Sequence, residues 1–187
     1  MNQPLSGMLT ITRPRCPICG AALVRVVGPK DSPLLLIGAY PGMEEVRSGI
    51  PWVGRAGEVL HTELRLVGIN YSTCRVTNIW LHSPLEEKDP RYKEELDWHF
   101  NQAIKELNNP NRRAVLLMGS LPSALLLDEA VSDVEGLLMT SPLIPKHIQV
   151  CVPSRNPASL LDEDAVVGPV REAFKVFAEK SRPYWRV

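Results

Sequence analysis

The sequence predicts an α/β fold of three layers, with helices on both faces of a central, mainly parallel sheet of four strands. From Pro33 onward, short apolar runs alternate with stretches of helical length, and this alternation is typical of parallel sheets with helical crossovers. The first run, Leu34–Gly38, is continuously apolar, as expected for a strand that is buried on both faces.

The first half of the predicted domain contains two strands and two helices. After the strand at Leu34–Gly38, a polar loop leads to a helix over Ala56–Val67, which ends at Gly68 because glycine is a frequent helix terminator. The second strand is Arg75–Trp80. The polar loop HSPLEEKDP follows it, and then a helix over about Arg91–Leu107, with asparagine and proline after its last turn.

The second half repeats this pattern. A strand at Ala114–Gly119 is followed by a helix at Leu121–Asp128, and a fourth strand is predicted at Ile148–Pro153. Between them, residues 134–143 fit either an irregular hairpin or an extended segment. The loop SRNPAS leads through short helical pieces to a last helix at Val167–Lys180.

The length and composition indicate one globular domain. The chain has 187 residues, of which 44% are hydrophobic and 22% charged, and these values are ordinary for a folded domain. We expect an N-terminal tail at residues 1–30, the α/β domain at 31–181 and a C-terminal tail at 182–187. The chain has 21 lysine and arginine residues and 21 aspartate and glutamate residues. This balanced charge argues against DNA binding without excluding it, since a local basic face remains possible.

Membrane association is not expected. The longest apolar runs, such as AVLLMG and SALLL, fall far short of the roughly 20 residues that cross a bilayer. The N-terminal sequence MNQPLSGMLTITRPR has no apolar core of signal-peptide length. We therefore expect a cytoplasmic location.

The four cysteines divide into two kinds. Cys16 and Cys19 form the knuckle Cys-Pro-Ile-Cys-Gly, whose spacing suits a metal better than a disulfide. Cys74 and Cys151 lie next to or within predicted strands and are interpreted as small core residues.

Three loops of unusual composition mark the expected ligand site. They are residues 39–57 after the first strand, 78–90 around the second and 154–161 after the fourth. In parallel α/β sheets, ligands bind at the carboxyl ends of the strands. The positions of these loops therefore predict a single site at that end of the sheet.

The sequences of these loops resemble those of the uracil-DNA glycosylase superfamily, and most closely its family 4 branch, whose members carry an iron–sulfur cluster. The resemblance runs from about residue 16 to 180 and rests on four segments in the family's order: GAYPG, GIPWVGRAG, VTNIW and VPSRNPASLL. The most specific is GIPWVGRAGEVL, where the family pattern is close to GRPFVGRAGQLL. The resemblance implies the same fold and DNA as a partner.

The resemblance also implies a pocket for a base that has left the duplex. Trp52 occupies the position of the family's stacking aromatic, and Asn78 that of the asparagine that reads the uracil edge, with Ala39 and Tyr40 beside the base. An asparagine amide offers both a donor and an acceptor, which suits that edge. The alternatives are a half-buried loop aromatic for Trp52 and a turn-forming residue at a strand end for Asn78.

Several catalytic positions depart from the family pattern. Ala39 stands where the family's GEAPG has glutamate, and Glu45 is the surviving candidate for a carboxylate that positions water, unless it is simply a solvated loop acid. Asn156 replaces the histidine of HPSxL, and a neutral donor stabilises a departing anion less than a charged one. The acids of HSPLEEKDP replace a supporting asparagine. Leu160 keeps the place of the DNA wedge, with core packing as the alternative.

The resemblance implies a metal site with altered ligands. The family's four cysteine positions are occupied here by Cys16, Cys19, His82 and His99. Two cysteines and two histidines are a common tetrahedral zinc shell, whereas iron–sulfur clusters prefer four thiolates. We expect a structural zinc ion that fixes the N-terminal tail to the domain; the alternatives are a [4Fe–4S] cluster or an open knuckle without metal.

Two functions remain open from the sequence. The first is a DNA glycosylase that hydrolyses the N-glycosidic bond of uracil or a related base, using Glu45 and Asn156. The second is a catalytically impaired protein of the same fold, acting as a DNA-binding, replication-associated or assembly subunit with a protein partner. A third idea, a site for a free nucleotide, has no supporting phosphate-binding motif. The sequence does not indicate an oligomeric state.

Overall fold

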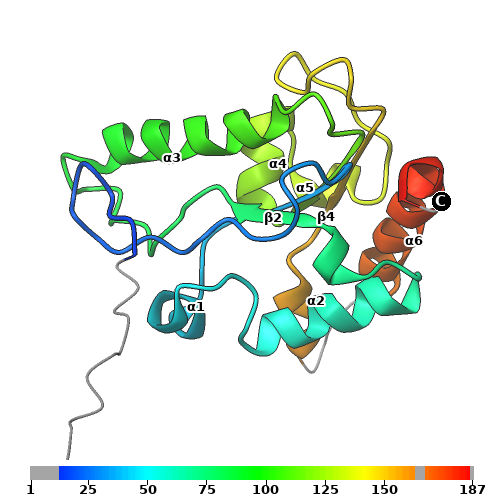
Figure 1. Ribbon diagram of the computed structural model, residues 1–187, viewed down its shortest axis with the longest axis horizontal. Coiled ribbons are helices and arrows are strands. Elements are labelled where there is room, and N and C mark those ends of the chain that lie inside the picture. The colour runs from blue at the N-terminus through cyan, green and yellow to red at the C-terminus, as the bar shows by residue number, and fades with distance from the viewer. Residues whose placement is uncertain (1–12, 163–166, 186–187) are drawn as a thin grey trace, which may run out of the picture.

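A computed structural model describes residues 13–162 and 167–185 of the protein. Its centre is a sheet of four strands in the order β2-β1-β3-β4, and every pair of neighbouring strands is parallel. The strands are β1 (Leu34–Gly38), β2 (Arg75–Asn78), β3 (Ala114–Met118) and β4 (Val150–Ser154). The predicted parallel four-stranded sheet is confirmed, and Figure 1 shows β2 and β4 among the surrounding helices.

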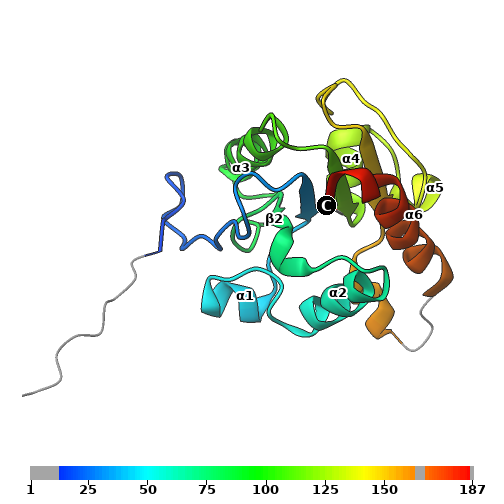
Figure 2. The same cartoon turned by 45° about the vertical axis from the view of Figure 1, so that its right-hand side comes forward.

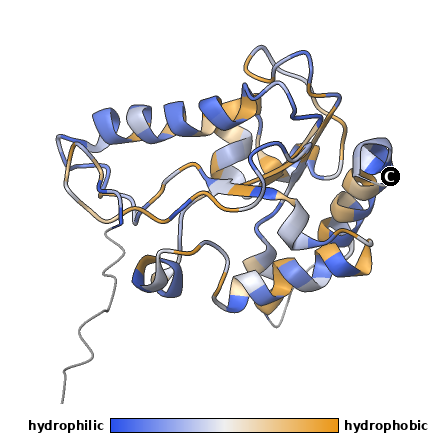
Figure 3. Ribbon diagram, viewed as in Figure 1, coloured by the Kyte–Doolittle hydropathy of each residue, from blue (hydrophilic) through white to orange (hydrophobic). Residues whose placement is uncertain are grey.

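Helices cover both faces of this sheet, which confirms the predicted three layers. One face packs against α2 and α6 through residues such as Leu64 and Phe174, and the other against α3 and α4 through residues such as Leu107 and Leu126. Hydrophobic and hydrophilic residues alternate along α2 and α6 (Figure 3), as expected for helices with one buried side. The helices are α1 (Met43–Ser48), α2 (Arg55–Leu66), α3 (Tyr92–Leu107), α4 (Ser120–Leu127), α5 (Val131–Val134) and α6 (Val167–Trp185), with short 3₁₀ helices η1 (Tyr71–Thr73) and η2 (Pro157–Leu161).

Two parts of the chain differ from the prediction, and a third decides between two predicted alternatives. The short helix α1 lies inside the first long loop, where no helix was expected. Helix α6 continues five residues beyond Lys180 to Trp185, whose indole Nε1 donates to Ser181 Oγ at 2.9 Å. After α5, the backbone N–H groups of Gly136 and Met139 donate to carbonyls of β4, so this stretch follows the extended alternative.

The N-terminal segment runs beside β2 rather than away from the domain. Val27 forms an antiparallel bridge with Val76, and the N–H of Val24 donates to Leu81 O. The knuckle packs with Leu81, which follows β2, and with Trp98 of α3. The N-terminal segment, drawn in blue, lies near one end of α3 in both views (Figures 1 and 2). Residues 1–12 of the predicted tail lie outside the described part of the chain.

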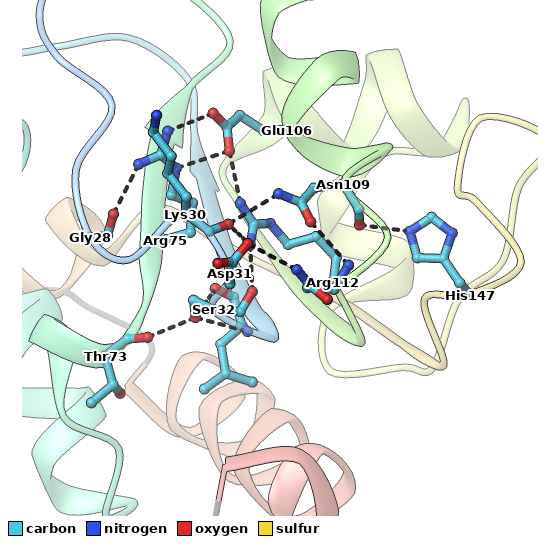
Figure 4. A network of polar contacts seen from close by, with 12 residues as sticks. Gly28, Lys30, Asp31, Ser32, Thr73, Arg75, Glu106, Asn109, Arg112 and His147 are labelled. Carbon is cyan, nitrogen blue, oxygen red and sulfur yellow. Dashed lines mark hydrogen bonds and ion pairs between the residues drawn. The ribbon is translucent and has the colours of Figure 1, made fainter.

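A buried ionic network ties the amino ends of the strands together (Figure 4). Arg112, just before β3, is fully buried and donates to Glu106 Oε2 at 2.9 Å and to the carbonyls of Lys30 and Ser32. Arg75, which begins β2, donates two further bonds to the same Glu106 carboxylate. The network therefore lies at the edge of the sheet opposite to the expected ligand site.

None of the helices in the described ranges is both long and apolar enough to cross a membrane.

Candidate functional site

The carboxyl ends of the strands surround a cavity of about 640 Å³. The loops after β1 and β4 and the last residue of β2, Asn78, contribute to its walls, and all lie in the three segments that the sequence predicts. A fourth contribution, which the sequence did not indicate, comes from Gly119–Leu121 after β3. The position of the cavity follows from the strand order β2-β1-β3-β4. The connections after β1 and β3 lead to opposite sides of the sheet, and ligands bind at such a switch point. Of the residues predicted for base binding and catalysis, the cavity is lined by Ala39, Tyr40, Glu45, Trp52, Asn78 and Asn156.

Trp52 and Asn78 meet at the end of β1. Trp52 is 7% exposed and Asn78 3% exposed, so both are more deeply placed than ordinary loop residues. A Cβ atom on Gly38 would lie 2.3 Å from Asn78 Oδ1 and 2.6 Å from Trp52 Cζ2. Only glycine at this position therefore lets the two side chains close over the strand.

Both side chains carry polar atoms that the protein leaves unpaired. Trp52 Nε1 and Asn78 Oδ1 are buried, and neither has a hydrogen-bond partner among the described residues. An unsatisfied buried donor or acceptor costs about 1–3 kcal/mol. Such atoms at the border of a cavity are consistent with groups that bind a ligand.

Glu45 has a structural contact that the sequence did not predict. Its Oε1 accepts hydrogen bonds from the N–H groups of Val53 and Gly54, at 3.0 and 2.8 Å. These residues directly follow Trp52, which has the unusual backbone angle φ 57°. Glu45 therefore holds the loop that carries the tryptophan, while its Oε2, near Gly42, accepts no hydrogen bond from the described residues.

The glycine of GRAG has a packing role beneath the same loop. A Cβ atom on Gly57 would lie 1.9 Å from the carbonyl oxygen of Trp52, a distance that real atoms cannot adopt. The first turn of α2 can therefore approach the backbone of Trp52 only with glycine at this position.

Asn156 presents a defined donor to the cavity. It precedes η2, and its Oδ1 accepts from the N–H of Ala158 at 2.9 Å. This bond fixes the amide orientation, so that Nδ2, a donor, is left for other partners. Ala39 lines the same cavity with a methyl group only, and the carboxylate that the family pattern places there is missing.

The rim of the cavity is largely apolar. Tyr40 is 57% exposed, and Met43, which also lines the cavity, is exposed three residues later. Arg55, at the first turn of α2, is exposed and supplies a positive charge to the same wall. Leu160, the predicted wedge, is half-buried and packs against the core on the α2 and α6 face.

A second group of reactive side chains lies between the knuckle, the loop after β2 and α3. One ligand atom from each of Cys16, Cys19, His82 and Glu95 lies within 4.8 Å of the others, and such a group could hold a metal ion. His99 Nε2 lies 2.9 Å from His82 Nε2. Glu95 was not among the predicted ligands; the available signal was its position one helical turn before His99, on the same side of α3.

Burial strongly affects the ionisation of this group. It lowers the pKa of His99 to about 3, with a further contribution from the neighbouring His82. Burial also raises the pKa of the Cys19 thiol to about 11, and a hydrogen bond with Glu95 adds to the shift. Both pKa shifts apply to the protein without a bound cation. The positive charge of a bound cation would favour the thiolate and the neutral imidazole.

The donor set does not fit a four-thiolate iron–sulfur cluster. Only Cys16 and Cys19 contribute sulfur to the group. Cys74 packs in the core on the α2 and α6 face, and Cys151 lies in β4 on the other face. The mixed sulfur, nitrogen and oxygen donors fit a single metal ion of the kind that accepts all three.

The cysteines are expected to differ in reactivity towards alkylation. Burial raises the pKa values of Cys74 and Cys151 to about 12, which lowers their thiolate fraction at pH 8 by about 10³-fold. After treatment with a chelator, Cys16 and Cys19 should be labelled first, because the short knuckle can open locally. Mass spectrometry of the alkylated peptides would measure this order, and labelling of Cys74 or Cys151 before the knuckle in the native protein would contradict it.

Comparison with known proteins gives a consistent family. A sequence profile of the Uracil DNA glycosylase superfamily matches residues 26–178. The chain is similar to the Type-4 uracil-DNA glycosylase of Pyrobaculum aerophilum, with 23% identity over 150 residues, or 77% of this chain and 76% of the relative. It is also similar to the protein of that name from Thermotoga maritima, with 31% identity over 61% of this chain and 62% of the relative. A third relative of that name, from Archaeoglobus fulgidus, is 22% identical over 82% of this chain and 79% of the relative.

Proposed function

The chain belongs to the uracil DNA glycosylase superfamily, and we propose that it binds DNA, takes a flipped uracil or related base into the cavity above β1 and hydrolyses its N-glycosidic bond. The observation that carries this proposal is the unpaired Oδ1 of Asn78 beside the side chain of Trp52 at the border of the cavity. They lie where a base would stack and be read.

The proposed recognition uses the complementary edges of uracil and asparagine. Uracil presents a donor at N3 and an acceptor at O4. The unpaired Oδ1 of Asn78 accepts from N3–H, while the Nδ2 of the same amide donates to O4. The indole of Trp52 supplies the apolar surface on which the base stacks.

The proposed chemistry relies on neutral donors and one carboxylate. As the bond breaks, the sugar becomes cationic and the base anionic. Asn156 Nδ2 donates to the departing base, and the free Oε2 of Glu45 orients the attacking water while Oε1 holds the loop. Because Ala39 contributes no carboxylate, we expect a slow enzyme.

DNA contacts are proposed at the rim. Arg55 contacts a phosphate, and the exposed ring of Tyr40 lies against the flipped nucleotide. The phosphate contact makes affinity fall with salt concentration. The role of Leu160 as a wedge stays a prediction, because its side chain packs against the core in this structure.

A second candidate function is a DNA-binding or assembly subunit that does not cleave. It is favoured by Ala39 and Asn156, which replace two ionisable groups of the family pattern at once. In this case the pocket would bind a base or a protein partner without breaking a bond.

An excision assay separates the two candidates. Protein in excess is incubated with oligonucleotides that carry uracil opposite guanine, opposite adenine or in single-stranded DNA, and alkali then cleaves the abasic sites. Scission at uracil is expected for the enzyme. Scission of none of the three substrates, together with measurable DNA binding, would support the second candidate and reject the first.

Restoring a carboxylate at position 39 is expected to accelerate excision. In Ala39→Glu the new side chain extends into the cavity, where it can stabilise the sugar cation, and we expect at least about a 10-fold rise in the single-turnover rate. The matched control is Ala158→Glu, which adds the same charge at another point of the cavity wall and should give no increase. A folded Ala39→Glu protein no faster than the parent would count against the proposed placement of the sugar.

We also propose that the metal group holds a structural zinc ion. Zinc accepts thiolate, imidazole and carboxylate ligands, and an ion here would fix the knuckle to α3 and to the loop after β2. None of the four residues of this group lines the cavity, and we assign the metal no part in the bond cleavage. Its contribution is to the stability of the N-terminal segment.

A further inference from the structure

Hydrogen bonds around the metal group distinguish its two imidazoles. His82 Nδ1 lies 2.7 Å from the carbonyl oxygen of Ser83. A carbonyl can only accept, so the hydrogen is on Nδ1 and His82 Nε2 carries a lone pair. That lone pair faces the other donors, with Cys19 Sγ at 3.5 Å and Glu95 Oε2 at 3.6 Å from Nε2. His82 therefore has the tautomer of a metal ligand, with its second nitrogen held by a backbone carbonyl.

His99 has the opposite arrangement. The backbone N–H of Leu81 donates to His99 Nδ1 at 3.4 Å. Because an N–H can only donate, Nδ1 carries the lone pair and the neutral ring has its hydrogen on Nε2. This nitrogen points into the group, and without a cation its N–H donates to the lone pair of His82 Nε2 at 2.9 Å. A cation that binds this lone pair displaces the N–H to another acceptor of the group. A protonated nitrogen cannot bind a metal, so His99 is held as a donor.

Glu95 offers what His99 lacks. Its side chain is 0% exposed, Oε1 lies 3.7 Å from Cys16 Sγ, and Oε2 is buried without a hydrogen-bond partner among the described residues. A buried carboxylate needs a partner charge. Arg91 is the basic residue on the preceding turn, but it is paired with Asp89 at 2.9 Å. A cation between the carboxylate, the two sulfurs and His82 satisfies the unpaired oxygen.

We propose that the four ligands of the metal are Cys16, Cys19, His82 and Glu95, and that His99 is a positioning residue whose Nε2–H donates to a sulfur or carboxylate ligand. This inference rests on the zinc site proposed above and replaces the ligand set with two histidines. It gives a mononuclear centre with two sulfur, one nitrogen and one oxygen donors, for which zinc is suited.

X-ray absorption of the zinc-loaded, full-length protein tests the ligand set directly. The expected spectrum contains two sulfur scatterers and the outer-shell signal of one imidazole. Two imidazoles would overturn the assignment of Glu95 while leaving the zinc site intact. A brown protein that contains iron and sulfide would reject the zinc site itself, so the two failures are distinguishable. The measurement needs no mutation and does not depend on a variant that folds.

Cobalt(II) substitution gives a second test through the visible bands of the tetrahedral ion. Glu95→Gln is expected to change the band positions and to weaken cobalt binding at least about 10-fold, because a charged ligand is lost. His99→Asn keeps an acceptor for the Leu81 N–H. It should keep the band positions and weaken cobalt binding by about 10–100-fold, which is typical when a residue that hydrogen-bonds to a metal ligand is lost. Glu94→Gln, an exposed neighbour on α3, is the matched control and should resemble the parent. Unchanged bands in Glu95→Gln, or shifted bands in His99→Asn, would overturn the proposal.

Discussion

Replacing Asn78 with aspartate is expected to lower the single-turnover rate of uracil excision by about 10²–10³-fold, the cost of losing one well-placed donor in an active site. Aspartate has nearly the same shape but offers acceptors only, so it repels uracil O4 where the amide donates. The position is 3% exposed, and water cannot replace the lost donor. The rate is measured with protein in excess over a uracil-containing oligonucleotide.

Two further variants make this result specific. Asn78→Ala should also be inactive, and because it buries no charge it separates lost recognition from a folding defect. Asn101→Asp makes the same chemical change on the exposed face of α3 and should keep the parent rate. Excision by a folded Asn78→Ala protein at a rate within a few-fold of the parent would show that Asn78 does not read the base.

Arg112→Met is expected to lower the free energy of unfolding by about 3–5 kcal/mol, as is typical when one partner of a buried ion pair is removed. Methionine fills much of the space of the arginine stem. It leaves the carbonyls of Lys30 and Ser32 without their donor and removes one of the two guanidinium groups that pair with Glu106. Denaturant unfolding measures the difference.

The adjacent arginine is a matched control. Arg113 donates to the carbonyls of Pro110 and Arg112 but forms no ion pair within the described residues, so Arg113→Met should cost about 1 kcal/mol or less. Equal losses in the two variants would contradict the importance of the network in Figure 4. The effect on uracil excision should be small in both, because the network lies at the amino ends of the strands.

The network also gives the stability a dependence on pH. Burial raises the pKa of Glu106, but the hydrogen bonds and charges of Arg75 and Arg112 outweigh it and leave the pKa below its usual value. A carboxyl group with a lowered pKa stabilises the fold above the pKa of the unfolded chain, and this contribution is lost as the pH falls through the folded value. The loss on acidification should therefore be smaller in Arg112→Met.

The layers and the ligand site follow from local features of the sequence. Continuous apolar runs such as Leu34–Gly38 indicate strands buried on both faces, and the alternation with helices makes the sheet parallel. In a parallel sheet the loops after the strands must meet at one edge, which is why Trp52 and Asn78 could be placed together without any knowledge of their contacts.

The remaining features depend on contacts between segments that are distant in the chain. The carboxylate of Glu45 acts on N–H groups eight and nine residues later, from a helix too short to be indicated by periodicity. The tautomers of His82 and His99 are set by backbone groups of Ser83 and Leu81, which the identity of the residues does not reveal. The strand order that brings Gly119 into the cavity is likewise a tertiary property.

The two ends of the sheet divide stability and function between them. At the amino ends, the Arg112 guanidinium donates to Glu106 and to nearby carbonyls, and only its Nε lacks a partner among the described residues. At the carboxyl ends, Trp52 Nε1 and Asn78 Oδ1 stay unpaired. Buried polar atoms without partners lower stability, and at the wall of a cavity a ligand can supply the missing bond. The unpaired Oδ1 of Asn78 at the wall of the cavity is the physical basis for placing the base there.

The most direct test of the account is to identify the product of the reaction. Protein in excess is incubated with a single-stranded oligonucleotide that carries one uracil, and the free base is measured by mass spectrometry beside the Asn78→Ala control. The account predicts release of free uracil by the parent protein, with an intact sugar–phosphate backbone before alkali, and little or none by the variant. An oligonucleotide that binds the parent protein but keeps its uracil would contradict it.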